Sequence, residues 1–177
     1  MNSKVISNIA VLVGCLAAVF SGTAAQAQNT ASLAVTANID SSATLTLSDT
    51  SGIASTLTFG GAGNETVAAS EGAITVSARL STTQGNTGTV IQIRCSDLNG
   101  QTAGNVIPAS DLSYVHTTDT GGGTWFSGVL HNDWSTLADL SSGSGLYSGD
   151  QIYALTVPPG ANDDTYTGTI SYQVVGF

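Results

Sequence analysis

Positively charged residues are scarce in this sequence. Its 177 residues include three Lys and Arg against twelve Asp and Glu, which gives a formal net charge of −9 at pH 7. Nucleic acids and anionic membrane surfaces are bound by clustered basic side chains, so this balance argues against both as partners. Charged residues of both signs make up only 8% of the chain, whereas 41% of it is hydrophobic. Because disorder usually accompanies low hydrophobicity, the chain is expected to fold.

The sequence has one long apolar run, and it lies near the N-terminus. Residues 1–27 have the organisation of a secretory signal peptide, with Lys4 first, an apolar stretch over residues 9–20 and an A-x-A cleavage site at residues 25–27. The stretch is short for a membrane-spanning helix. An alternative interpretation treats residues 12–15 as a lipobox that would lipidate Cys15. The favoured expectation is cleavage without lipidation. Cleavage would leave a secreted, non-membrane-spanning domain of residues 28–177. This domain has two basic and twelve acidic residues, a formal charge of −10.

Cysteine is nearly absent, because cleavage would leave Cys95 as the single thiol. An intrachain disulfide is then excluded. In residues 89–95 the apolar side chains of Ile91, Ile93 and Cys95 alternate with Gln92 and Arg94, so the period of two places Cys95 on a buried face. The favoured interpretation is an inert core thiol. An intermolecular disulfide and a reactive nucleophile are the alternatives.

The abundant residues are those of β-structure. Thr, which suits strands better than helices, is frequent, and polar breaks separate short alternating segments. Residues 81–88 resemble a hairpin loop, Asn99-Gly100 a type I′ turn, and residues 134–140 at most one short helical turn. About nine or ten strands cannot pair as one open sheet without curling. We therefore predict a single antiparallel β-sandwich, immunoglobulin-like or jelly-roll-like, with strands at residues 32–39, 43–47, 55–59, 74–80, 89–95, 112–116, 124–131, 151–157 and 165–175.

Motifs for catalysis and metal binding are lacking. The chain contains no G-x-S-x-G, H-E-x-x-H or P-loop sequence, and its carboxylates are scattered singly. The acidic residues at Asp97 and at Asp163-Asp164 are poorly spaced for a calcium-binding loop. Turn capping is the simpler role for them. We predict a non-enzymatic protein with no cofactor and no bound metal. A carboxylate pair assembled by the fold, as in a hydrolase, is the least favoured alternative.

Aromatic residues make up 6% of the chain. Trp125, Phe126 and Trp134 lie near a glycine-rich segment and would suit a sugar-stacking surface. The favoured interpretation places them in the core, where large aromatic side chains usually pack.

Both ends of the chain resemble known fibre subunits. The order of residues 33–39, 43–47, Leu57-Thr58-Phe59-Gly60, residues 74–78 and the final residues 165–172 is similar to that of bacterial pilus subunits of the spore-coat-U and chaperone–usher kind. Those families usually carry a disulfide, whereas Ser42, Ala43 and Ala78 stand where its cysteines would be expected. TasA-like or camelysin-like fibre subunits, which lack it, are the sibling interpretation.

The resemblance implies a structural subunit of an extracellular surface filament that polymerises by β-strand donation. Its partners would be copies of itself, with a chaperone or usher during export. The candidate donor strand is residues 28–39, which would follow directly from signal cleavage. The alternative is that this segment pairs within the sheet of its own chain and is not donated. The alternative function is a secreted carbohydrate- or surface-binding adhesin module. The donor face would comprise Leu33, Val35, Ala37 and Ile39.

Overall fold

The described part of the chain is built from strands. The structure is a computed structural model that describes residues 29–38, 43–49, 52–53, 56–61, 63–80, 88–140 and 144–176. The expected signal peptide, residues 1–27, lies outside these ranges. The regular structure is fourteen strands and one short 3₁₀ turn, η1 (Ala109–Asp111). Nine strands have five or more residues, which agrees with the expected number, and the all-β class is confirmed.

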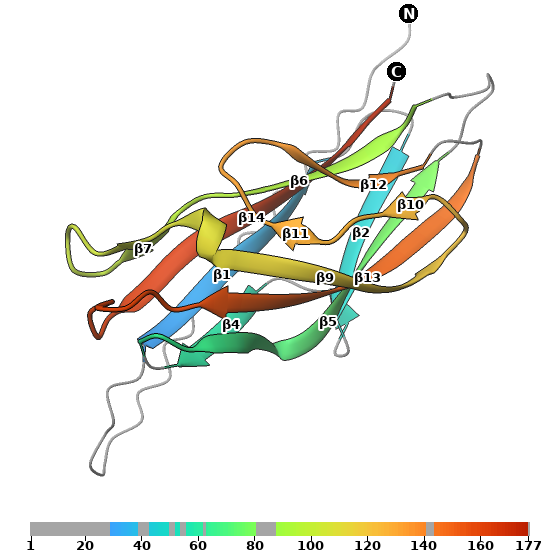
Figure 1. Cartoon of the computed structure of the whole chain (residues 1–177). Coiled ribbons are helices and arrows are strands. Elements are labelled where there is room, and N and C mark those ends of the chain that lie inside the picture. The colour runs from blue at the N-terminus through green and yellow to red at the C-terminus, as the bar shows by residue number, and fades with distance from the viewer. Residues whose placement is uncertain are drawn as a thin grey trace, which may run out of the picture.

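The strands form two sheets (Figure 1). Sheet A has the order β10 (Thr124–Trp125), β12 (Ser135–Asp139), β6 (Val90–Cys95), β14 (Thr165–Val175), β1 (Asn29–Asn38) and β4 (Thr56–Gly61). In addition, β7 (Leu98–Gly100) pairs with β14 and with β8 (Val106–Ile107). Sheet B has the order β11 (Gly128–Val129), β9 (Leu112–Thr120), β13 (Gly145–Thr156), β5 (Thr66–Leu80), β2 (Ala43–Asp49) and β3 (Gly52–Ile53).

The inward faces of the two sheets share one hydrophobic core. Alternate residues point inward along β4, β6 and β13 and along the second half of β5, as the period of two predicts. Across the core, the hydroxyls of Tyr153 in β13 and Tyr172 in β14 lie 2.5 Å apart and form a hydrogen bond. Both phenols are fully buried, and this burial raises the pKa of each. The core aromatic side chains are therefore chiefly tyrosines, together with Phe59.

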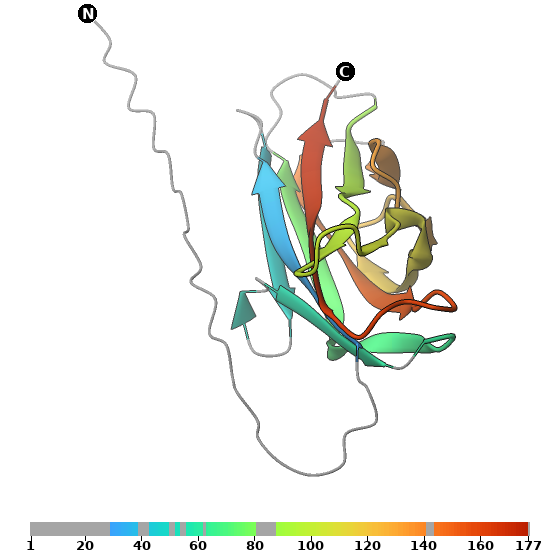
Figure 2. The ribbon, with the colours of Figure 1, turned by 90° about the vertical axis from the view of Figure 1, so that its left-hand side faces the viewer.

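One pairing departs from the antiparallel expectation. β1 runs parallel to β14, from Thr30 beside Thr165 to Asn38 beside Gln173, and antiparallel to β4 on its other side. Figure 2 shows β1 and β14 as neighbouring arrows that point the same way. The first and last strands need no hairpin between them, since nearly the whole domain separates them in sequence. The chain then passes from β1 in sheet A to β2 in sheet B.

Several local predictions are wrong. The segment 124–131 does not form one strand, because β10 pairs with β12 in sheet A whereas β11 pairs with β9 in sheet B. Residues 135–139 form strand β12 where a short helical turn was expected. β5 and β6 belong to different sheets, so the segment 81–88 is not a hairpin loop, and residues 81–87 lie outside the described residues.

The Asn99-Gly100 turn is also misplaced. Both residues belong to β7, and the chain turns over residues 101–104, where Gly104 has a φ of 90°. Asp164 fixes this turn, because its carboxylate accepts hydrogen bonds from the backbone N–H groups of Gln101 and Thr102 and from the Asn105 amide. Asp164 lies about sixty positions away from the turn in the sequence, so local turn preferences could not predict these hydrogen bonds.

Candidate functional site

The N-terminal strand occupies an interior position in sheet A. Leu33 is fully buried, Ala34 is exposed, and Val35 is partly buried against the core. These three residues follow the predicted alternation. The side chain of Ala37 and the whole of Ile39, which complete the expected donor face, lie outside the described residues. In the single chain, β1 pairs within its own sheet, along its whole length with β14 and through Asn29 to Ala34 with β4.

β4 forms one edge of sheet A, and a side chain from sheet B caps it. The backbone N–H of Thr58 donates to a carboxylate oxygen of Glu71 at 2.8 Å. Glu71 lies where β5 bulges, since the pairing of β5 with β13 skips from Ala68 to Ala73. A charged side chain at a sheet edge blocks pairing with another strand. This contact therefore protects the outer side of β4, whereas its inner side pairs with β1.

The three aromatic residues singled out in the sequence do not form one surface. Trp125 is partly buried and packs against the edge of the core, where its ring stacks on His116 with centroids 5.6 Å apart. Phe126 is 41% exposed. Trp134 is partly buried, and the Arg94 guanidinium lies 4.5 Å from its ring centroid. The expected core placement is therefore wrong for Phe126 and only partial for the two tryptophans.

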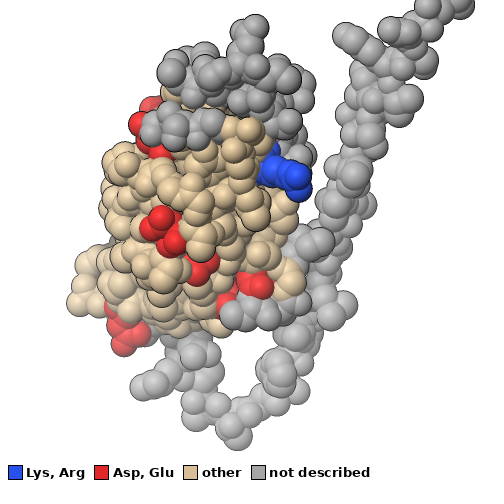
Figure 3. Space-filling view, turned by 90° about the vertical axis from the view of Figure 1, so that its right-hand side faces the viewer, with Lys and Arg blue, Asp and Glu red and all other residues tan. Residues whose placement is uncertain are grey.

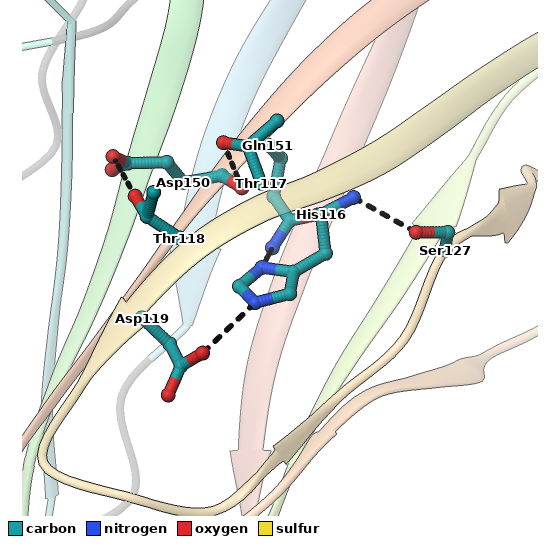
Figure 4. A network of polar contacts seen from close by, with 7 residues as sticks. All are labelled: His116, Thr117, Thr118, Asp119, Ser127, Asp150 and Gln151. Carbon is teal, nitrogen blue, oxygen red and sulfur yellow. Dashed lines mark hydrogen bonds and ion pairs between the residues drawn. The ribbon is translucent and has the colours of Figure 1, made fainter.

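A polar cluster surrounds His116 on β9 (Figure 4). Its Nε2 lies 3.2 Å from an Asp119 oxygen, and its Nδ1 lies 3.3 Å from the amide nitrogen of the buried Gln151. The Gln151 amide donates to Nδ1, which leaves the proton of a neutral ring on Nε2, facing Asp119. The backbone N–H of His116 donates to the Ser127 hydroxyl at 2.9 Å. These contacts hold the ring in place and join β9 to β13, and they supply no nucleophile.

The neighbouring Asp150 connects three strands of sheet B. One oxygen accepts from the Thr75 hydroxyl of β5 at 2.6 Å and the other from the Thr118 hydroxyl of β9 at 2.7 Å. These hydrogen bonds are the main reason that the pKa of Asp150 is lowered. Hydroxyl donors that favour the carboxylate form make Asp150 a poor proton donor at neutral pH. Asp150 is better suited to holding strands together.

Cys95 is a core thiol, as its position in the strand predicted. It is fully buried and makes no disulfide. Burial, helped by the negative charge of Asp97, raises the pKa of the thiol to about 12. Its sulfur donates to the Ser96 carbonyl. A protonated, buried thiol is a poor nucleophile, so the structure favours the inert core thiol over the reactive nucleophile.

The two acidic segments considered for calcium have other roles. Asp97 accepts from the backbone N–H of Ala109 at 2.9 Å. The oxygens of Asp164 accept four N–H hydrogen bonds, from Gln101, Thr102, Asn105 and Thr165, and the pKa of this carboxyl is lowered to about 2. Within the described ranges, no group of three or more His, Cys, Asp or Glu side chains is placed to hold a metal ion.

The surface agrees with the low charge of the sequence. Figure 3 shows acidic side chains scattered over a mostly uncharged face, with a single small basic area. In the part of the chain that the structure covers, no helix has the length and hydrophobicity needed to cross a bilayer. A comparison with protein-family models finds no match, and a comparison with curated protein sequences finds none either.

Proposed function

We propose that this protein is the structural subunit of an extracellular filament and that neighbouring subunits exchange strand β1. In this proposal residues 28–177 form a single β-sandwich that is secreted after removal of residues 1–27. The observation that carries the proposal is the position of β1. It is the first strand of the mature domain, yet it lies inside sheet A between β14 and β4.

Removing β1 would leave a slot between two strands that do not pair with each other. β14 would lose the backbone pairing of nine register positions and β4 of six. The slot would also open above the core, because Leu33 is fully buried there. Burying a Leu side chain contributes about 1.5–3 kcal/mol, so a refilled slot is strongly favoured over an empty one.

The same contacts can be made by β1 of another copy. Exchange of an identical element between chains adds no new interface chemistry, which makes it a low-cost route to assembly. Each subunit would receive a strand on one side and donate its own elsewhere. Such head-to-tail contacts produce an open polymer when the rotation between copies does not close a ring. A chaperone or usher that covers the slot during export is the partner this scheme requires.

A cross-linking experiment distinguishes donation from self-pairing. Ala34 of β1 and Thr169 of β14 are register partners on the outer face of sheet A. Neighbouring strands lie about 4.7–4.9 Å apart, within the range that a disulfide spans. We would introduce A34C into one tagged chain and T169C into a differently tagged chain, both with C95A. The two chains would be co-expressed in cells that export and assemble the protein, and the assembled material would be oxidised. The matched control replaces T169C with T156C, at an exposed position in sheet B.

Donation predicts disulfide-linked pairs that carry both tags, with T169C and not with T156C. The chain with both A34C and T169C should then form a ladder of cross-linked oligomers on a non-reducing gel. If that chain yields only internally cross-linked monomer, and the mixed tags never join, β1 belongs to its own chain and the proposal is wrong. The secreted binding module would then be the favoured function.

A further inference from the structure

A polar groove lies at the end of β6 on the outer face of sheet A. Its volume is about 410 Å³. It is lined by residues of β6, of β14 and of the loop that precedes β12. Its polar lining consists of Arg94, Ser96, Asp97, Asn132, Thr169 and Ser171. The groove is separate from the His116 cluster, which belongs to sheet B.

Hydrogen bonds hold three side chains of the groove, Asp97, Asn132 and Ser96, in fixed orientations. Asp97 accepts from the Ala109 N–H at 2.9 Å. With its amide nitrogen turned inward, Asn132 donates to Asp97 at 3.2 Å and to the Cys95 carbonyl at 2.8 Å. The Ser96 hydroxyl accepts from the Thr169 N–H at 2.9 Å. Because these groups are already ordered, a ligand would bind without the cost of immobilising them.

Arg94 provides a cation beside these groups. Its guanidinium lies over the Trp134 ring, 4.5 Å from the centroid, which is within the range of a cation–π interaction. Across the described residues, Arg94 makes no salt bridge with a carboxylate, although Asp97 lines the same groove. The contact with the ring restrains the guanidinium of Arg94, which also lines the groove.

We infer that this groove binds a neutral saccharide. A sugar hydroxyl both donates and accepts, and the groove offers both kinds of partner. The Arg94 guanidinium donates, the Asp97 and Asn132 oxygens accept, and the Thr169 hydroxyl does either. An acidic ligand fits poorly, because Asp97 lies in the groove and the whole chain carries a formal charge of −9.

The site differs from the aromatic surface considered from the sequence. Of the three aromatic residues named there, only Trp134 contacts a residue that lines the groove, which is Arg94. The inference is also independent of filament assembly, since the groove is formed mainly by β6, β14 and the loop at Asn132. Either proposal can fail while the other holds.

The test is binding of the intact mature protein to immobilised oligosaccharides. The neutral probes are cello-, malto-, xylo- and chito-oligosaccharides, and the acidic probe is oligogalacturonate. We expect retention on at least one neutral probe. R94A should weaken it about tenfold or more, because the variant removes a charged hydrogen-bond donor from the groove. R79A removes the same charge from an exposed position on β5 in sheet B and should leave binding unchanged.

A second variant separates neutral from acidic ligands without disturbing the fold. In D97N the new amide oxygen can still accept from the Ala109 N–H, while the negative charge is lost. Binding of a neutral sugar should weaken because a charged acceptor is gone, whereas binding of an acidic ligand would strengthen. The inference is overturned if no neutral probe is retained, if R94A and R79A bind alike, or if D97N improves binding to oligogalacturonate alone.

Discussion

The contact between Gly149 and Trp125 gives a sharp prediction about stability. A Cβ atom built on Gly149 in β13 would lie 2.5 Å from Cδ2 and Cε3 of the Trp125 ring. These atoms belong to the fused part of the indole, which cannot move without moving the whole side chain. The ring also stacks against His116, with an interplanar angle of 15°. G149A should therefore displace Trp125 from the edge of the core.

Two opposing effects determine how much G149A changes the free energy of unfolding. Overpacking of a filled site typically costs about 1–3 kcal/mol. Replacing Gly by Ala within a strand otherwise stabilises by roughly 0.5–1 kcal/mol, because the unfolded chain loses conformational freedom. The backbone of Gly149 does not lie in the left-handed region, so this gain is available. The net expectation is a loss of about 1 kcal/mol or more in G149A. In the W125A background, where the ring is gone, G149A should be neutral or stabilising.

Urea unfolding of the four proteins in this double-mutant cycle measures the coupling. G145A, on the same strand, is the control, because its Cβ would meet the nearest atoms at an ordinary 3.6 Å. If G149A lowers stability equally with and without Trp125, the clash is not the cause. If G145A costs as much as G149A, the effect belongs to the strand backbone.

Two further predictions follow from buried or hydrogen-bonded acids. The Cys95 thiol, with its pKa raised to about 12, should react slowly with a thiol reagent at pH 8, and C95D should fail to fold whereas C95A folds. Rapid labelling of the native protein would contradict this placement. Asp164 has a folded pKa of about 2, below the unfolded value near 3.9, so its contribution is present above about pH 4 and lost as pH falls towards 2. D164N should flatten the decline of melting temperature over that interval, and an unchanged slope would refute the assignment.

The features predictable from the sequence are those that depend on the period of two. The inward positions of Leu33, Ile74 and Cys95 follow from alternation along single strands. The all-β class follows from the same pattern repeated along the chain. The parallel pairing of β1 with β14 was not predictable, because alternation fixes which face a side chain occupies and leaves the neighbouring strand undetermined.

The contacts that build the candidate sites depend on the tertiary arrangement. Arg94 and Trp134 are forty residues apart and meet because β12 pairs with β6. His116 and Gln151 are 35 residues apart and meet because β9 pairs with β13. β12 itself was not predictable because two of its adjacent residues, Leu137 and Ala138, are both buried at a register shift. Such a bulge removes the alternation by which a strand is recognised.

The position of β1 also determines what filament assembly requires. Only residues 39–42 separate β1 from β2 in the sequence, so the strand of the same chain competes for the slot at a high effective concentration, in the millimolar range for short connections. A strand from another copy offers identical contacts and no additional affinity. Donation can therefore prevail only if self-pairing is prevented until a neighbour arrives. Once exchanged, the strand would be held by the same buried Leu33 and the same register, and its release would be slow. Under the proposed function, a factor that covers the slot during export is thus a physical requirement of assembly, and omitting it should yield stable monomers with β1 in their own sheet.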